Sequence, residues 1–280
     1  MEVSLSLTTS REPLLLKKVN GPHKWKPCLL SFSLPDRFSQ SLFCQPGYRI
    51  REDISLKVSS SQKGDVRVVD FRHIIGLAGP PGAGKSTLAF EVAKRVNKLW
   101  PEKAPSFDSQ VNSPDVAAVI PMDGFHLYRS ELDAMENPKE AHERRGAPWT
   151  FNPVKLLSCL ENLRNQGSVY APSFDHGVGD PVEDDIFVSL QHKVVIVEGN
   201  YLLLEDGVWK EVSSIFDEKW FIDIDIDKAM QRVLRRHIST GKPQDVAKWR
   251  IENNDRPNAE LIMKSKKSAD IIIKSVDFSR

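Results

Sequence analysis

Residues 79–86 read Gly79-Pro80-Pro81-Gly82-Ala83-Gly84-Lys85-Ser86, which is the pattern G-x-x-x-x-G-K-S. Glycines at three of these eight positions let the backbone turn tightly enough for successive N–H groups to point at phosphate oxygens. In loops of this kind the lysine reaches the β- and γ-phosphates, and the serine offers its hydroxyl to Mg²⁺. The stretch therefore predicts a phosphate-binding loop in which Lys85 and Ser86 carry the chemistry.

The segments on either side of this loop support that interpretation. Before it, His73–Ala78 is a short apolar run of the kind found in a buried strand. After it, a helix is predicted from Thr87 to Val96, because Leu88 and Val92 recur with Val96 on one helical face. A strand, a glycine loop and a helix in this order put the positive end of the helix dipole at the anion site. The alternative is a turn rich in glycine and proline that merely joins two elements.

The rest of the chain alternates between strand-like and helix-like segments from about residue 65. Apolar runs typical of buried strands occupy residues 117–122, 194–197, 220–224 and 271–273, and helical spacing recurs over 154–163 and 228–237. This alternation predicts an α/β fold with a mostly parallel sheet and helices on both faces. Residues 169–174 and 186–188 predict a small excursion of two strands.

Two carboxylates follow predicted core strands directly. Asp123 comes after the strand at 117–122, and Glu198 comes after the strand at 194–197. Ligands of parallel sheets collect at the carboxyl ends of the strands, so both acids are expected near the phosphate loop. A glycine follows each of them, which we expect to let a ligand approach closely. Such a pair suits a phosphotransferase, with one acid orienting and deprotonating a hydroxyl and the other holding Mg²⁺ or substrate. The alternatives are a turn aspartate and a structural glutamate.

Composition bounds the classes of function. The formal net charge is +1, so the whole chain shows no excess of basic residues that would indicate nucleic acid as a partner. The three cysteines form neither a disulfide framework nor a metal-binding spacing, which favours a reducing compartment. No apolar run approaches the length of a membrane span, and we expect no membrane partner. Nothing groups His, Cys and acids into a zinc site, so a metal is expected to be nucleotide-bound Mg²⁺.

The N-terminal residues 1–61 differ from the rest. They hold nine Lys or Arg against five Asp or Glu, are rich in serine, and are interrupted by prolines. The absence of a compact apolar region with a cleavage site argues against a secretory signal, and the composition favours a disordered leader that acts as an organelle transit peptide. We expect a plastid first and a mitochondrion second. The alternative is an untargeted tail on a cytoplasmic protein. Residues 62–280 are then the catalytic domain.

Gly79–Thr87, the Asp123-Gly124-Phe125-His126 motif and the run from Val194 to Asn200 resemble the phosphoribulokinase/uridine kinase/pantothenate kinase family. The resemblance covers most of residues 70–275. It implies a three-layer P-loop kinase fold and transfer of phosphate from ATP, with Mg²⁺, to a hydroxyl of a small metabolite. It also implies that loop residues 79–87 bind ATP, that Asp123 is the catalytic base and that Glu198 lies near metal and substrate.

Two further segments match the family less specifically. Residues 232–237 resemble the start of its lid, here expected around 232–256, whose arginines fold over the phosphates and stabilise the charge in transfer. The resemblance assigns Arg232 and Arg236 to ATP and Arg235 to catalysis. Residues 144–151 resemble an acceptor-site segment, in which Arg145 is favoured over Arg144 because Gly146 follows it. The alternatives are a solvated basic helix and simple surface charge.

Departures from the family pattern limit the prediction of the acceptor. Uridine kinases typically carry Asn-Phe-Asp-His-Pro where this chain has residues 145–148, and residues 174–177 replace a Tyr-Asp-Phe style of sequence. Residues 254–259 resemble a subgroup of uncharacterised or sugar-directed kinases. His126 and His176 are candidates for acceptor contact, or else ordinary core and surface histidines. Uridine or pantothenate kinase stays an alternative, a nucleotide-driven regulatory NTPase is the alternative of another class, and a homodimer is among the assemblies left open.

Overall fold

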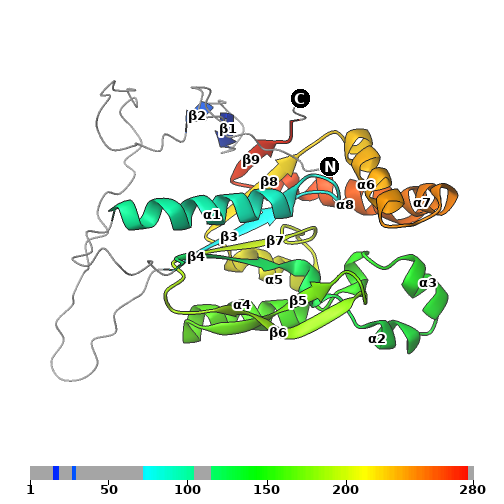
Figure 1. Ribbon diagram of the computed structural model, residues 1–280, viewed down its shortest axis with the longest axis horizontal. Helices are drawn as coiled ribbons and strands as arrows, with labels where there is room; N and C mark the ends of the chain where they lie inside the picture. The colour runs from blue at the N-terminus through cyan, green and yellow to red at the C-terminus, as the bar shows by residue number, and fades with distance from the viewer. Residues whose placement is uncertain (1–14, 19–26, 30–71, 104–114, 277–280) are drawn as a thin grey trace.

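The computed structural model describes residues 15–18, 27–29, 72–103 and 115–276. Five parallel strands form the centre of its main sheet, in the order β9-β8-β3-β7-β4 (Figure 1). They are β3 (His73–Ala78), β4 (Ala117–Pro121), β7 (Val194–Gly199), β8 (Glu218–Asp223) and β9 (Ile271–Lys274). All five were predicted to within about two residues. The one-residue difference in β4 arises because Met122 already begins a 3₁₀ helix.

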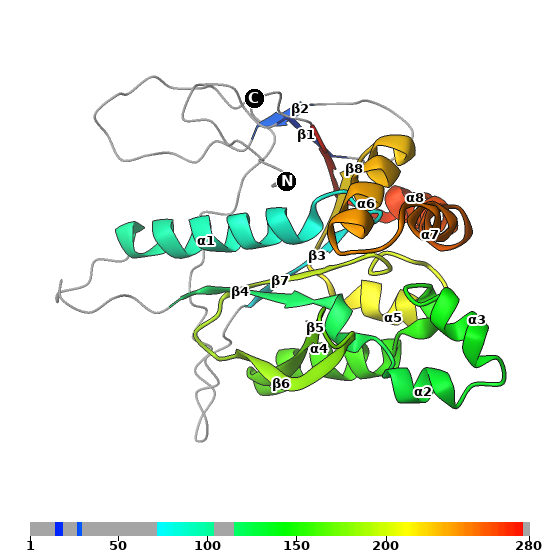
Figure 2. The same ribbon diagram turned by 45° about the vertical axis from the view of Figure 1, so that its right-hand side comes forward.

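Helices cover both faces of this sheet, as predicted. One face packs against α1 (Lys85–Lys103) and α6 (Ile226–Ser239), and the other packs against α4 (Pro153–Gln166) and α5 (Gly207–Ile215) (Figures 1 and 2). Successive strand residues point to opposite faces. Val195 and Val197 therefore join the α4/α5 cluster, whereas Ile196 between them joins the α1/α6 cluster. The result is a three-layer α/β fold with two apolar cores.

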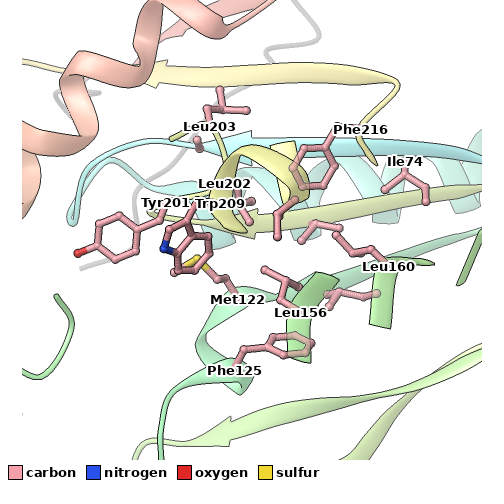
Figure 3. Close-up of a cluster of buried hydrophobic side chains, with 14 of the residues drawn as sticks. Ile74, Met122, Phe125, Leu156, Leu160, Tyr201, Leu202, Leu203, Trp209 and Phe216 are labelled. Atoms are coloured by element: carbon pink, nitrogen blue, oxygen red, sulfur yellow. The ribbon is translucent and has the colours of Figure 1, made fainter. Parts of the chain in front are cut away.

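The core under α4 and α5 reaches the sheet edge where β3, β4 and β7 end. Figure 3 shows Tyr201 and Trp209 packed beside Met122 there, while Ile74 and Phe216 lie deeper. Tyr201 and Met122 are fully buried. This packing fixes the segments that follow β4 and β7, which are the segments that carry Asp123 and Glu198.

A second, two-stranded sheet lies beside α4; its two strands were predicted, but the second begins at Asp180, six residues before the predicted start at residue 186. It is the antiparallel hairpin of β5 (Val169–Asp175) and β6 (Asp180–Val188). The hairpin contacts the 3₁₀ helix η1 (Met122–Phe125), and its turn points toward α2 (Arg129–Asp133) and α3 (Pro138–Glu143). The 3₁₀ helix η2 (Pro148–Thr150) precedes α4. The hairpin therefore stands over the segment that follows β4.

The region predicted as a lid forms a helical array. After α6 come α7 (Gln244–Arg250), a π-helical turn (Ile251–Asp255) and α8 (Arg256–Lys264), and the 3₁₀ helix η4 (Ser265–Ser268) leads into β9. The sequence predicted the helix α6 and a lid around 232–256, which takes in α7 and the π-helical turn, whereas α8 and η4 lie beyond the predicted lid. The array projects from the same end of the molecule as α2 and α3 (Figure 2).

Two short antiparallel strands, β1 (Leu15–Lys18) and β2 (Pro27–Leu29), extend the main sheet beyond β9. They lie within the predicted leader, and the rest of residues 1–61 falls outside the described part of the chain, so the leader and its boundary stay predictions. In the described ranges no helix combines the length and apolarity that crossing a membrane needs.

Candidate active site

The phosphate loop follows β3 and opens α1, as predicted. Gly82 and Gly84 have φ of +80° and +93°, a region that side-chain-bearing residues rarely adopt. A Cβ at Gly82 would also lie 2.5 Å from the carbonyl oxygen of Ala229 in α6. The first helical hydrogen bond of α1 joins the Leu88 N–H to Gly84 O at 3.0 Å. The N-terminus of α1 therefore opens directly into the loop, which is the arrangement that binds phosphate.

Two oxygen acceptors hold Lys85 in place, one within the loop and one beyond the end of β7. Its Nζ donates to Asn200 Oδ1 at 2.7 Å and to the carbonyl of Pro80 at 3.2 Å. Burial lowers the pKa of Lys85, while the charges of Glu198 and Asp123 oppose that shift. Sequence analysis assigned no role to Asn200. Its place two residues after Glu198, beyond the end of β7, was the signal that would have found it.

Ser86 and Glu198 form a hydrogen-bonded pair. The Ser86 hydroxyl donates to Glu198 Oε1 at 2.9 Å, and Glu198 is 6% exposed. Burial raises the pKa of this carboxyl group, and the negative charge of Asp123 adds to the shift, whereas Lys85 opposes it. The two residues predicted to bind metal are therefore neighbours.

Asp123 lies on η1, directly after β4. Because β4 and β7 are adjacent and in register from Ala117–Val194 to Pro121–Glu198, the two predicted acids leave the sheet side by side. Asp123 is close enough to act electrostatically on both Lys85 and Glu198. The structure thus brings together Lys85, Ser86, Asp123 and Glu198 at one edge of the sheet.

The glycines after the two acids serve a purpose other than the expected one. A Cβ at Gly124 would lie 2.1 Å from the carbonyl oxygen of Pro172 in β5, and one at Gly199 would lie 2.4 Å from the Cβ of Met122. Both glycines make room for neighbouring protein segments. The expectation that they admit a ligand was wrong, because the hairpin and η1 occupy that space.

His126 lies between two aromatic rings. Its ring centroid is 3.9 Å from that of Phe151 and 4.8 Å from that of Phe174 in β5. The Nδ1 atom lies 2.8 Å from the backbone carbonyl of Asp123, which can only accept, so Nδ1 carries the proton. Burial lowers the pKa of His126. His176 is exposed in the β5–β6 turn, with its ring 5.2 Å from Phe174. The two predicted histidines therefore flank one phenylalanine.

Arg145 lies beside the same ring. Its guanidinium carbon is 5.7 Å from the Phe174 centroid, and its Nη2 donates to Asp180 Oδ1 at 3.1 Å and to the carbonyl of Leu127 at 2.9 Å. The Arg145 Nε atom is buried without a hydrogen-bond partner. Arg144, in contrast, turns away and donates to the backbone carbonyl of Asn253. The two arginines therefore point to different parts of the protein, and only Arg145 lies beside Phe174.

Of the three predicted arginines of α6, Arg232 is hydrogen-bonded to the loop. Arg232 Nη1 donates to the Gly82 carbonyl at 3.1 Å and to Ser275 Oγ at 3.0 Å. The positive charge of Arg236 adds to the lowering of the Lys85 pKa that burial causes. Arg235 and Arg236 are both exposed on the same helix.

The oxygen atoms at the loop suit a hard divalent cation. The Ser86 hydroxyl and the Glu198 carboxylate are ligands of the kind that Mg²⁺ prefers, and Mg²⁺ normally completes its shell with phosphate oxygens and water. Within residues 72–103 and 115–276 no group of three or more His, Cys, Asp or Glu side chains could hold a metal ion by itself. The residues therefore fit a cation that arrives with a nucleotide.

Comparison with known proteins identifies the family to which this fold belongs. The phosphoribulokinase / uridine kinase family model matches residues 74–279. A Schizosaccharomyces pombe protein named as a candidate uridine kinase is 37% identical over 209 residues, which cover 73% of this chain and 84% of that protein. The uncharacterized protein YggC of Escherichia coli is 35% identical over 213 residues, covering 75% of this chain and 80% of its own.

Solved structures agree. A candidate fructose transport system kinase from Silicibacter sp. TM1040 is 30% identical and covers 74% of this chain and 91% of its own, with a TM-score of 0.61. The Saccharomyces cerevisiae protein YFH7 shows the same fold at 23% identity, covering 75% of this chain and 93% of its own, with a TM-score of 0.62. The chain belongs to the phosphoribulokinase / uridine kinase family, and it is thereby a P-loop kinase that acts with ATP on small metabolites.

Proposed function

We propose that the protein transfers the γ-phosphoryl group of ATP to a hydroxyl of a small sugar- or nucleoside-like metabolite. One observation carries this proposal: Asp123 just after β4 and Glu198 near the end of the adjacent parallel strand β7 both lie near Lys85 of the phosphate loop. A site that only binds or hydrolyses a nucleotide needs no second carboxylate facing an acceptor wall. We propose that His126, Phe174 and Arg145, which lie together beside η1, form such an acceptor wall.

Asp123 is the proposed base. As the acceptor oxygen forms its bond to the γ-phosphorus, the bond from that phosphorus to the bridging oxygen of ADP breaks and ADP leaves with the electron pair. The hydroxyl proton passes to the Asp123 carboxylate. General bases of this kind contribute about 10²–10⁴-fold to turnover.

Cationic and polar groups of the chain stabilise the charge on the phosphates. Lys85 already holds a fixed position through Asn200, so little reorganisation is needed when phosphate binds. Arg235 and Arg236 are exposed on α6, and we propose that Arg236 binds ATP and that Arg235 meets the charge that develops during transfer. Ser86 and Glu198 would hold Mg²⁺, which when bound neutralises phosphate charge as a Lewis acid.

The acceptor wall suits a ligand with both apolar and hydrogen-bonding surface. Phe174 offers a ring face, and the neutral His126 leaves Nε2 as an acceptor, because Nδ1 holds the proton. Arg145 and His176 add donors at the rim. These groups support a sugar or nucleoside, with uridine and pantothenate as specific alternatives.

An acceptor panel tests the proposal. Purified protein with MgATP would be offered nucleosides, sugars, pantothenate and small hydroxy acids one at a time, with ADP release as the readout. The proposal expects one chemical class of acceptor to raise the rate by at least about tenfold over the acceptor-free rate, since positioning a reactant contributes far more than that. Equal hydrolysis with and without every acceptor would instead favour a regulatory NTPase. Light scattering would separately determine whether the protein is a monomer or a homodimer.

A further inference from the structure

Residues 253–258 read Asn-Asn-Asp-Arg-Pro-Asn and lie between the arginine helix α6 and the acceptor segment at residues 144–147. They span the end of the π-helical turn and the start of α8. We call this stretch the bridge segment. No role in phosphate or acceptor binding falls to it in the proposed function. Widened helical turns of this type often occur at functional sites, and this one has contacts both with the acceptor segment and with α6.

Toward the acceptor side, the bridge segment binds the backbone carbonyl of Arg145, the predicted acceptor arginine. Asn254 is 1% exposed, and its amide donates to the carbonyl of Arg145 at 2.9 Å. Arg250 Nη2 donates to the same carbonyl at 3.2 Å. Asn258 donates in turn to Asn254 Oδ1 at 3.1 Å, which fixes the orientation of the Asn254 amide. A buried amide with both ends paired is costly to misplace.

Proline at position 257 explains one more contact. Pro257 has no N–H, so it cannot donate to the carbonyl of Asn253 four residues earlier, as a helical residue normally would. That carbonyl instead accepts a hydrogen bond from the Arg144 guanidinium. The acceptor segment is therefore attached at a carbonyl that Pro257 cannot bind.

Toward the nucleotide side, the bridge segment holds both ends of α6. Asp255 Oδ2 lies 2.9 Å from Nε2 of His237, the residue that follows Arg236. The side chains of Asp255 and His237 are 13% and 12% exposed. Arg256 Nη2 pairs with Asp227 Oδ1 at 2.9 Å in the first turn of the same helix. The predicted arginines of α6 therefore lie between two attachments to one short segment.

We propose that Asn254 and Asp255 are positioning residues that couple the arginine helix to the acceptor segment. This rests on the proposed function, because it takes α6 to contact ATP and residues 144–147 to contact the acceptor. Adjacent residues 254 and 255 bind the two sides, so a shift of α6 onto phosphates moves the backbone of Arg145 with it. Because such coupling is reciprocal, acceptor binding also favours the closed position of the arginines. Phosphate is then clamped only when an acceptor is in place.

Hydrogen exchange measures this coupling without knowledge of the acceptor. The probe is Mg²⁺ with a non-hydrolysable ATP analogue, added to the full-length protein. In the wild type, the analogue should slow amide exchange in α6 and also in residues 144–150, which the analogue itself does not touch. The transmitted slowing should be about fivefold or more, the lower end of usual coupling between sites.

Asn254→Ala should keep analogue affinity within about threefold and keep the slowing in α6, but should lose the slowing at residues 144–150. Asn253→Ala is the matched control, because Asn253 is exposed and its side-chain amide donates to the carbonyl of Trp249 in α7, away from the acceptor segment. Asp255→Asn is the second variant, for use if Asn254→Ala does not fold. It keeps the shape of the side chain but removes the charge that faces His237, and it should lose the same slowing at residues 144–150.

Three outcomes separate the claims. Transmitted slowing that survives in Asn254→Ala and in Asp255→Asn would overturn the coupling. Slowing at residues 144–150 that is absent from the wild type, while the analogue binds and protects α6, would overturn it as well. Failure of the wild type to bind the analogue at all would instead count against the proposed function.

Discussion

The phosphate side and the acceptor side of the site are built in different ways. The phosphate side is one contiguous stretch, residues 79–87, completed by Asn200 and Glu198 from the neighbouring strand. The proposed acceptor side gathers His126, Arg145 and Phe174 from separate elements, and the bridge segment connects it to α6. A local loop binds what every kinase of this type shares, whereas an assembled wall can vary with the acceptor.

Asp123 stands where the two sides meet, and its replacement has the largest expected effect. Asp123→Asn keeps the shape of the side chain but cannot take a proton, so turnover should fall about 10²–10⁴-fold. ATP affinity should change little, because the phosphate loop is intact. Turnover and nucleotide affinity would be measured together, with Asp133→Asn in α2 as the exposed control.

Two results would change the role assigned to Asp123. A loss of turnover under about tenfold, below the range of a general base, would assign Asp123 to structure and leave Glu198 as the better base. A collapse of ATP affinity would move Asp123 to the phosphate side as a metal-site residue.

On the phosphate side, Lys85→Ala should lower turnover about 10²–10³-fold, the usual cost of one preorganised charge-stabilising donor, and should also weaken ATP binding. Circular dichroism would establish that the variant is folded, and ADP release would give the rate. Near wild-type turnover in a folded variant would contradict the assignment of the phosphate loop.

A smaller loss is expected from the arginine helix. Arg235→Ala should lower turnover about 10- to 100-fold and ATP affinity less, because hydrogen bonds to a charge are worth about 1.5–3 kcal/mol and this charge develops during transfer. Steady-state kinetics of Arg232, Arg235 and Arg236 single alanine variants would rank the three. Wild-type kinetics in all three would make the cluster a solvated face.

The two sides should also respond to pH with opposite sign. Burial raises the folded-state pKa of Glu198, so the native state binds its proton more tightly and this carboxyl costs stability as pH rises above 4.5. Burial lowers the pKa of His126, so its contribution is lost as pH falls below 6.5. Either slope is at most about 1.4 kcal/mol per pH unit.

Denaturant unfolding across this pH range would measure both slopes. Glu198→Gln should remove the loss of stability on the alkaline side, and His126→Gln should remove the loss on the acidic side. Identical pH profiles for the wild type and both variants would show that neither group is held in an unusual protonation state by burial.

The smallest effect on catalysis is expected from the N-terminus. Removing residues 1–61 should leave the fold and ATP binding of residues 62–280 intact but abolish organelle import, with the chloroplast as the predicted destination. A fluorescent fusion of the full-length protein and thermal unfolding of the shortened protein would test the two halves. Diffuse cytosolic fluorescence would contradict targeting, and failure to fold would contradict a dispensable leader.

The sequence predicted what depends on local pattern. The strands are continuous apolar runs, and the loop carries its chemistry in eight consecutive residues, so both could be identified without contacts. Asn200 could not be assigned because its role depends on the reach of Lys85 across from another strand. The space next to Gly124 and Gly199 is filled by Pro172 and Met122, which only the packing of η1 and the hairpin determines.

The lid shows the same limit. The helical spacing of α6 was readable, but the π-helical turn depends on tertiary contacts, among them the attachment of Arg144 to Asn253. The sequence of residues 254–259 resembles a subgroup of the family but does not indicate what these residues contact. Asn254 binds the Arg145 carbonyl and Asp255 pairs with His237 of α6, contacts that depend on the tertiary fold.

The central claim is that a metabolite hydroxyl, and not water, receives the phosphoryl group. The direct measurement incubates the protein with a cell extract and ATP whose γ-phosphate carries ¹⁸O, then identifies labelled products by mass spectrometry. The account predicts a labelled phosphate ester that forms with the wild type and is strongly reduced with Asp123→Asn. Labelled inorganic phosphate as the sole product, formed at the same rate with and without extract, would contradict it.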